Sequence, residues 1–208
     1  TFRWHDSQEE TVEWNNLDRF NAFNQSPFDQ TLLIDADFFI TKNNLLNYFD
    51  GLNDFMVYKD AYDITEQNKL DDCVYMTQNK FKMLWATVCY FQKTDHVARI
   101  FEHWQKVQDN FKYYAQLFGF SFECYRNDYA MTIANHLCNG YSTNNTFIGK
   151  LPSLSPHDEV VDFKDNKFVV RYDRGLKKDC VLWDNNLHIM NKRSILESNI
   201  FDKMWNSV

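Results

Sequence analysis

The sequence predicts a layered α/β fold with flanking helices, in which the sheet is mixed but mostly parallel. Short apolar segments of strand character alternate with amphipathic helical segments through the first half of the chain. The strand segment 31–40 opens with a continuously apolar run, which is typical of a strand covered on both faces. A hairpin pattern at 160–172 adds an antiparallel part.

The first expected elements are a helix over residues 8–24 and the strand 31–40. The apolar positions of the helix fall near helical spacing: Val12, Leu17, Phe20 and Phe23. The dipeptide at 26–27, Ser-Pro, ends this helix. After the strand, Thr41 is expected to cap a short helix through about residue 48, which Gly51 ends.

The middle of the chain predicts two strands, at 55–58 and 83–92, separated by a polar, irregular surface excursion at 60–80. Thr94 or Asp95 then caps a long amphipathic helix. Its core-facing stripe has i, i+3, i+4, i+7 spacing: Val97, Ile100, Phe101, Trp104, Val107, Phe111 and Tyr114. We interpret this aromatic stripe as core packing. Another helix is expected from about residue 127 to 137.

The last third predicts the hairpin 160–172 with its turn at Asp165-Asn166, and short strands at 181–183 and 187–190. A capping box at 194–197 predicts that the chain ends in a helix. We see no internal repeat and no linker. The expected organisation is therefore a single domain over residues 1–208.

Composition excludes several classes of protein. The chain has 208 residues, of which 44% are apolar, 25% charged and 17% aromatic, so it is neither disordered nor fibrous. Its five glycines never form a phosphate-binding loop of the GxGxxG or GxxxxGK[ST] type. The net charge of −7 argues against a broad nucleic-acid surface. The longest apolar run, 83–91, is too short to span a membrane, and there is no signal-peptide pattern.

The five cysteines are odd in number and form no CxxC pair, so we interpret them as reduced, partly buried thiols. A disulfide or zinc site is the minority alternative. The expected location is the cytoplasm, or the host cytoplasm if the chain is viral. Because the chain begins at Thr1 without a Met, we expect it to be a fragment, a processed chain, or the ordered part of a longer one.

The most informative feature is Asp35-Ala36-Asp37, two carboxylates two residues apart at the end of an apolar strand. Strand alternation would point both to the same side. Two like charges there are costly unless a cation or hydrogen-bond donors compensate them, and Mg²⁺ or Mn²⁺ is the simplest compensation. The alternative is structural, in which one carboxylate caps the following helix and the other meets solvent.

Four segments, in order, resemble motifs of GT-A-type glycosyltransferases, in particular the glycogenin-like family and its relatives in phages and bacteria. Residues 26–37, SPFDQTLLIDAD, resemble the metal-binding strand. Residues 84–95, with the helix that follows, resemble the family's next strand. Residues 122–131, FECYRNDYAM, resemble its "D-Q-d-a-l-n" segment, and 187–192, LHIMNK, its late "H-f-x-G-x-x-K" motif. The resemblance covers most of residues 15–195.

The resemblance implies a GT-A-like fold and transfer of a sugar from a nucleotide-diphosphate sugar, UDP-sugar being the first choice. Mn²⁺ or Mg²⁺ would neutralise the leaving diphosphate. The metal ligands would be Asp35, Asp37 and His188. Asp128 would orient the sugar hydroxyls or sit beside the reacting carbon, with Glu123 as its rival. The donor contacts would come from a further group of residues: Arg19, Ala36, Trp85, Ala86, Thr87 and Lys192.

The chain departs from the family pattern in three places. Residues 85–87, Trp-Ala-Thr, stand where the family has small residues that usually include Gly. The spacing from His188 to Lys192 is two residues shorter than in the family and lacks its Gly. The family normally places a first nucleotide-binding βαβ unit well before the paired carboxylates. Only 34 residues precede Asp35, so we expect this unit to be missing, shortened or disordered.

Two further functions remain open. One is a catalytically lapsed binding or structural module of the same fold, and the other a different metal-dependent phosphotransferase or nuclease that uses the same carboxylates. A glycoside hydrolase has little support, because only the spacing of the two carboxylates favours it. The acceptor would be a glycan, a protein or a modified nucleobase, and retention of anomeric configuration is expected only by analogy.

Overall fold

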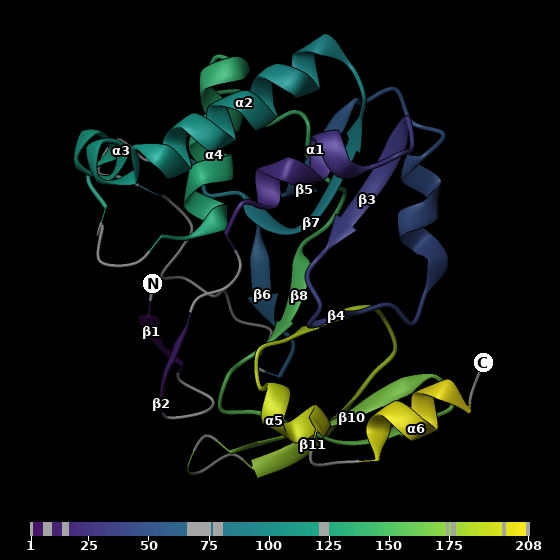
Figure 1. Cartoon of the computed structure of the whole chain (residues 1–208). Coiled ribbons are helices and arrows are strands. Elements are labelled where there is room, and N and C mark those ends of the chain that lie inside the picture. Colours follow the sequence, from purple (N-terminus) through teal and green to yellow (C-terminus); the bar gives the residue numbers. More distant parts are fainter. Residues whose placement is uncertain are drawn as a thin grey trace.

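The computed structural model describes residues 2–5, 10–13, 17–65, 76, 81–120, 125–173, 175, 178–196 and 199–206. Figure 1 shows helices α2, α3 and α4 gathered at one end of the molecule, beside strands β3, β5 and β7. Strands β10 and β11 lie at the opposite end with α5 and α6. Strands β4, β6 and β8 lie between these two groups.

The first sheet contains β3 (Gln30–Ile34), β7 (Trp85–Gln92) and β5 (Phe55–Tyr58), with β7 in the centre and antiparallel to both neighbours. Strand β7 is buried along nearly its whole length, which explains its continuously apolar sequence. From Val88 to Phe91 its side chains alternate between two hydrophobic clusters, one on each face of the sheet. The strands predicted at 55–58 and 83–92 are therefore confirmed.

Helices α2 (Asp95–Asp109) and α4 (Asn127–Cys138) cover one face of this sheet. The Thr94 side chain caps α2 by accepting a hydrogen bond from the backbone N–H of Val97, as its sequence predicts. The expected stripe is buried from Val97 to Val107, and α2 ends two residues further on. The last two residues of the stripe, Phe111 and Tyr114, lie on the next helix, α3 (Phe111–Phe118). The opposite face is covered by η2 (Asn43–Tyr48) and by residues such as Phe147.

The second sheet has the order β4 (Phe38–Phe39), β12 (Leu187–Ile189), β8 (Leu151–Leu154) and β6 (Ala61–Asp63). Strand β12 is antiparallel to β4 but parallel to β8, and β8 is parallel to β6. This sheet brings the segment after β3 next to the last third of the chain, a sequence separation of about 150 residues.

The third sheet is the predicted hairpin, β9 (Glu159–Lys164) and β10 (Lys167–Asp173), extended by β11 (Lys178–Trp183). Asp165 and Asn166 both adopt positive φ, as a two-residue hairpin turn requires. Helices α5 (Lys192–Leu196) and α6 (Ile200–Trp205) pack against this sheet and bury Ile195 and Ile200 in a third hydrophobic cluster. Among the described helices, none is both long and apolar enough to cross a membrane.

The chain is a mixed α/β protein with flanking helices. The expected mixed, mostly parallel sheet describes the second sheet, but the described strand pairs of the first and third sheets are all antiparallel. Strands β3 and β5 run in the same direction, as the alternation of strands and helices suggested, yet β7 lies between them and pairs antiparallel with each. The parallel pairs between named strands, as far as the chain is described, are β12–β8 and β8–β6. Residue patterns within one segment do not reveal which strand will be inserted between two others.

The helix predicted over 8–24 is wrong in its first half. Residues 2–5 and 10–13 form strands β1 (Phe2–His5) and β2 (Glu10–Glu13), which pair antiparallel. Among the described residues of this segment, helical structure begins with η1 (Arg19–Asn21) and continues in α1 (Ala22–Gln25). Asp18 has φ near 60°, a left-handed conformation that a right-handed helix cannot pass through.

Three smaller expectations also fail. The segment 31–40 is not one strand, because its backbone turns between β3 and β4. Thr41 does not cap η2, since its N–H donates to the Asn186 side chain and residue 42 is the N-cap. Ser194 lies inside α5, where its N–H donates to the Asn191 side chain, so Asn191 and not Ser194 caps this helix.

The excursion expected at 60–80 is partly regular. Residues 61–63 form β6, and Asp63, Ile64 and Thr65 are buried. Most of the remainder, 66–75 and 77–80, lies outside the described residues. The strand β8 had no counterpart in the sequence prediction. Its sequence, LPSL, is four residues long and contains Pro152, which weakens any strand pattern.

Candidate functional site

The paired carboxylates lie in a tight turn between β3 and β4. Asp35 donates its N–H to the carbonyl of Thr87 (2.8 Å), which fastens the start of the turn to β7. Phe38 donates its N–H back to the carbonyl of Asp35 (3.0 Å), and Ile189 donates to the carbonyl of Asp37 (2.8 Å). The turn is thus held by the first sheet on one side and by β12 on the other. Its carboxylates are placed by this turn and not by strand alternation.

Asp35 faces Arg19. The guanidinium Nη1 of Arg19 is hydrogen-bonded to Oδ1 of Asp35, and the Arg19 side chain is only 6% exposed. The Nε and Nη2 atoms of Arg19 are buried without a hydrogen-bond partner among the described residues. Burial raises the pKa of the Asp35 carboxyl above its ordinary value, and the Arg19 charge opposes this increase without cancelling it. Arg19 therefore has hydrogen-bond donors to spare for an anion.

Asp37 faces two groups from the other end of the chain. Its Oδ1 lies 3.5 Å from Nε2 of His188 on β12, and its Oδ2 lies 3.1 Å from Nζ of Lys192 at the start of α5. Burial acts to raise the pKa of the Asp37 carboxyl, but hydrogen bonding and charge from His188 and Lys192 outweigh it. The pKa of Asp37 is held well below its usual range, so this carboxylate is ionised at neutral pH.

His188 is oriented by a buried hydroxyl. Its Nδ1 lies 3.1 Å from Oγ of Ser153, and Ser153 is fully buried on β8. The two residues are cross-strand partners in the parallel β8–β12 pair. With Nδ1 engaged, the ring presents Nε2 to Asp37. Metal-binding histidines are commonly oriented by a hydrogen bond at their second nitrogen in this way.

Asp128 lies in the first turn of α4 and faces β7. Its Oδ1 accepts the backbone N–H of Ala86 (2.9 Å), and its Oδ2 accepts a hydrogen bond from Nη2 of Arg126 (3.1 Å). Its charge contributes to the raised pKa of Asp35, which places the two carboxylates in the same electrostatic environment. Glu123, the expected rival of Asp128, lies outside the described residues.

The segment 85–87, expected to line a sugar pocket, contributes mainly its backbone to the site. Trp85 is only 8% exposed and packs in the hydrophobic cluster on the η2 side of the first sheet, and Ala86 belongs to the cluster on the α2 side. Through their backbones, Ala86 holds Asp128 and Thr87 holds Asp35. Ala36, at the tip of the turn, is exposed.

The donor set fits a divalent cation at Asp37 and His188 and fits less well at Asp35. The Asp37 carboxylate is of the type that binds Mn²⁺ or Mg²⁺. The His188 imidazole, 3.5 Å from it, is a common ligand of transition metals, and Ser153 orients this imidazole. Asp35 is turned toward Arg19. Within the described part of the chain, no group of three or more His, Cys, Asp or Glu side chains is close enough to hold a metal by itself.

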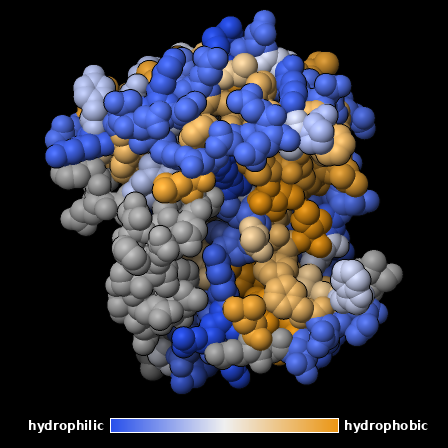
Figure 2. Space-filling model, viewed as in Figure 1, coloured by the Kyte–Doolittle hydropathy of each residue, from blue (hydrophilic) through white to orange (hydrophobic). Residues whose placement is uncertain are grey.

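Charge is balanced within this cluster. The described carboxylates are Asp35, Asp37 and Asp128, and the described cations paired with them are Arg19, Lys192 and Arg126. Figure 2 shows that the face seen in Figure 1 is hollowed near its middle, with hydrophilic residues in the hollow and apolar surface beside it. The described charges of the cluster therefore nearly cancel, and a cation and an anion bound together would keep the net charge small.

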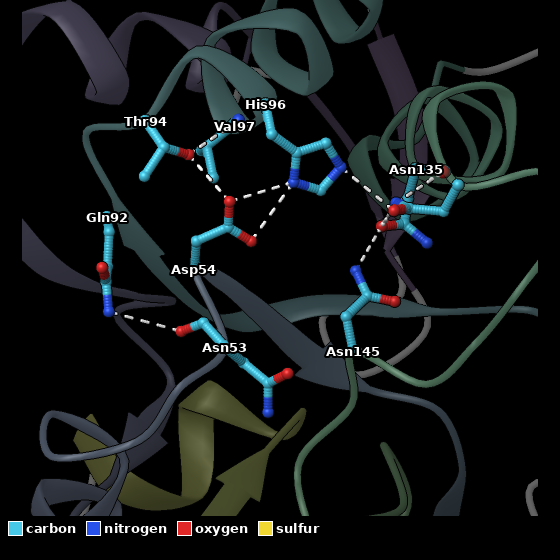
Figure 3. A network of polar contacts seen from close by, with 9 residues as sticks. Asn53, Asp54, Gln92, Thr94, His96, Val97, Asn135 and Asn145 are labelled. Atoms are coloured by element: carbon cyan, nitrogen blue, oxygen red, sulfur yellow. Dashed lines mark hydrogen bonds and ion pairs between the residues drawn. The ribbon is translucent and has the colours of Figure 1, made fainter.

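A second polar network lies at the far end of the first sheet (Figure 3). His96, in the first turn of α2, places Nδ1 against the Asp54 carboxylate (3.0 and 3.2 Å) and Nε2 against Oδ1 of Asn139 (3.0 Å). Thr94 donates to the same Asp54 carboxylate (2.8 Å). Asn139 and Asn145 both donate to Oδ1 of Asn135, a residue on α4. Because both nitrogens of His96 are engaged, this network ties β5, α2 and α4 together and offers no open base.

Sequence reasoning missed Ser153 and Arg126. Both act on residues that it did find, His188 and Asp128. Arg126 stands two residues before Asp128, so it could have been noticed as a nearby cation. Ser153 is 35 residues from its partner, and only the pairing of β8 with β12 brings the two together.

Comparison with known proteins identifies no relative. No family model, no curated protein and no solved structure matches the chain.

Proposed function

We propose that this protein is a metal-dependent glycosyltransferase of GT-A-like fold that uses a nucleotide-diphosphate sugar. The supporting observation is that one turn, Asp35–Asp37, gathers side chains from distant segments. Three of them contact the turn: Arg19 from η1, His188 from β12 and Lys192 from α5. Asp128, at the start of α4, acts on Asp35 through its charge. The resemblance had assigned Arg19 and Lys192 to donor binding, His188 to metal binding and Asp128 to catalysis, from the sequence alone.

In this proposal Asp37 and His188 hold Mn²⁺ or Mg²⁺, with Asp35 acting directly or through a water molecule. The metal would supply Lewis-acid neutralisation of the leaving diphosphate. Arg19 would donate its Nε and Nη2 hydrogens to a phosphate oxygen, and Lys192 would act as a point charge on the same group. Asp128, fixed by Ala86 and Arg126, would accept hydrogen bonds from the sugar hydroxyls.

The test is release of UDP from UDP-sugars by the full chain in the presence of MnCl₂. Replacing Asp37 with Asn should lower this activity by about 100-fold, because a preorganised charge at the reacting diphosphate is lost. Asp162→Asn is the matched control, since Asp162 also pairs with a lysine, Lys203, but lies on β9. Full activity in the Asp37→Asn protein would refute the proposal.

A specific observation also favours the second candidate, a catalytically lapsed binding module. Each carboxylate of the turn already has a protein cation, Arg19 for Asp35 and Lys192 for Asp37. In such a module these pairs would simply stabilise the turn. Titration calorimetry with MnCl₂ and UDP- or GDP-sugars separates the two functions. An active transferase should release or absorb heat on binding them, whereas a lapsed module that serves in an assembly should show no heat with any of them.

A further inference from the structure

Lys192 and a divalent cation would use the same carboxylate. Nζ of Lys192 lies 3.1 Å from Oδ2 of Asp37, whose other oxygen faces His188. The Lys192 side chain is 47% exposed, whereas the Asp37 side chain is 18% exposed. The lysine therefore reaches from the surface to a mostly buried carboxylate, and its flexible stem allows it to move away without disturbing the turn.

The charges around Asp37 disfavour a cation that arrives alone. The described cluster has three carboxylates and three cations, so a further charge of +2 would be unbalanced. It would also lie close to the Lys192 ammonium and repel it. A diphosphate brings negative charge that rebalances the cluster, and it offers Lys192 a new partner within reach of the same stem.

We propose that Lys192 competes with the divalent cation for Asp37, and that the lysine transfers to the diphosphate when cation and nucleotide bind together. This inference rests on the proposed function, because it assumes that Asp37 is a metal ligand. It adds a coupling between the two ligands: the cation binds weakly by itself, and a bound nucleotide diphosphate raises the affinity of the protein for the cation. By thermodynamic linkage, the cation must strengthen nucleotide binding by the same factor.

The test is Mn²⁺ binding by the full chain, measured as the loss of the free Mn²⁺ electron paramagnetic resonance signal, without nucleotide and then with saturating UDP. Without UDP, Lys192→Gln should bind Mn²⁺ about three- to fivefold more tightly than the unmodified protein, the size of a partly exposed ion pair. With UDP, this advantage should disappear or reverse. Lys192→Arg, which keeps the charge, should behave like the unmodified protein.

Lys203→Gln is the matched control, because Lys203 is 49% exposed and also pairs with an aspartate, Asp162, on a different part of the surface. It should leave Mn²⁺ binding unchanged. One outcome overturns this inference but leaves the proposed function standing. In it, Asp37→Asn abolishes Mn²⁺ binding, but Lys192→Gln binds Mn²⁺ no more tightly than the unmodified protein. If neither the unmodified protein nor Lys192→Gln binds Mn²⁺, with or without UDP, the proposed function fails as well.

Discussion

At the scale of single residues, the central feature is an aspartate whose charge is stabilised by groups from far along the chain. Asp37 is mostly buried, yet contacts with His188 and Lys192 keep its pKa below the ordinary value. Its neighbour Asp35 shows the opposite shift, because burial outweighs the Arg19 charge. Two carboxylates two residues apart therefore differ in acidity, because burial dominates at Asp35 and charged partners dominate at Asp37.

The lowered pKa of Asp37 predicts how stability depends on pH. Its ionised form stabilises the fold fully above the unfolded-state pKa of about 3.9, and this contribution is lost as pH falls below that value toward the lowered folded-state pKa. Asp37→Asn removes the titrating group. Between pH 6 and pH 3, the free energy of unfolding of Asp37→Asn should therefore fall less than that of the unmodified protein, by roughly 1 kcal/mol.

Urea unfolding at several pH values measures this difference. Asp50→Asn is the control, since Asp50 is an exposed carboxylate that follows η2. An equal loss of stability in Asp37→Asn and the unmodified protein between pH 6 and pH 3 would contradict the assignment of this proton linkage to Asp37.

At the scale of elements, the pairing of β8 with β12 is what orients the histidine of the site. It places Ser153 directly beside His188 and sets which ring nitrogen faces Asp37. The β4–β12 pairing then brings His188 next to Phe38, one residue after Asp37. Asn186, just before β12, accepts hydrogen bonds from the backbone N–H groups of residues 41 and 42. It thereby holds the segment after β4 beside β12.

Ser153 is thus a positioning residue, and its removal tests this role. Ser153→Ala should lower Mn²⁺ affinity about tenfold, because the His188 ring loses the hydrogen bond that orients it. Thr94→Ala is the control, since it removes the cap of α2 and should cost about 1 kcal/mol of stability away from the site. Equal Mn²⁺ affinities in the two variants, at similar loss of stability, would mean that Ser153 has only a structural role.

At the scale of the whole molecule, three hydrophobic clusters hold three sheets around the charged turn. The largest includes Trp104, which is fully buried and donates its indole N–H to the hydroxyl of Tyr125 (3.1 Å). That hydroxyl in turn donates to Asn127 at the start of α4, one residue before Asp128. Core packing and the position of Asp128 are therefore connected.

A pair of tryptophan variants measures how much this core stabilises the fold. Trp104→Ala should lower the free energy of unfolding by about 3–5 kcal/mol, because it leaves a large cavity. Trp205→Ala should change it by no more than about 0.5 kcal/mol, since Trp205 is 84% exposed on α6. Similar losses in both variants, measured by denaturant unfolding, would contradict the assignment of Trp104 to the core.

Local patterns were sufficient for much of the secondary structure. Strand β7, helices α2 and α4, and the hairpin β9–β10 each have a continuous signal in their own residues: apolar runs, helical periodicity with a Thr cap, and an Asp-Asn turn. The N-terminal segment shows the limit of this reasoning. Val12 fits a helical stripe, yet strand pairing and the left-handed Asp18 decide its conformation.

The sequence by itself determined the residues worth examining: Asp35, Asp37, His188, Lys192, Asp128 and Arg19. Only the tertiary structure decided how they meet. The turn after β3 aims the carboxylates at Arg19 and at the β12–α5 segment. The β4–β12 pairing, across about 150 residues, brings His188 and Lys192 to the turn, and the β8–β12 pairing adds Ser153. The physical reason is that charge compensation acts through space. A carboxylate can be recognised from its neighbours in the chain, but its partner is set by which strands pair and which helix ends beside it.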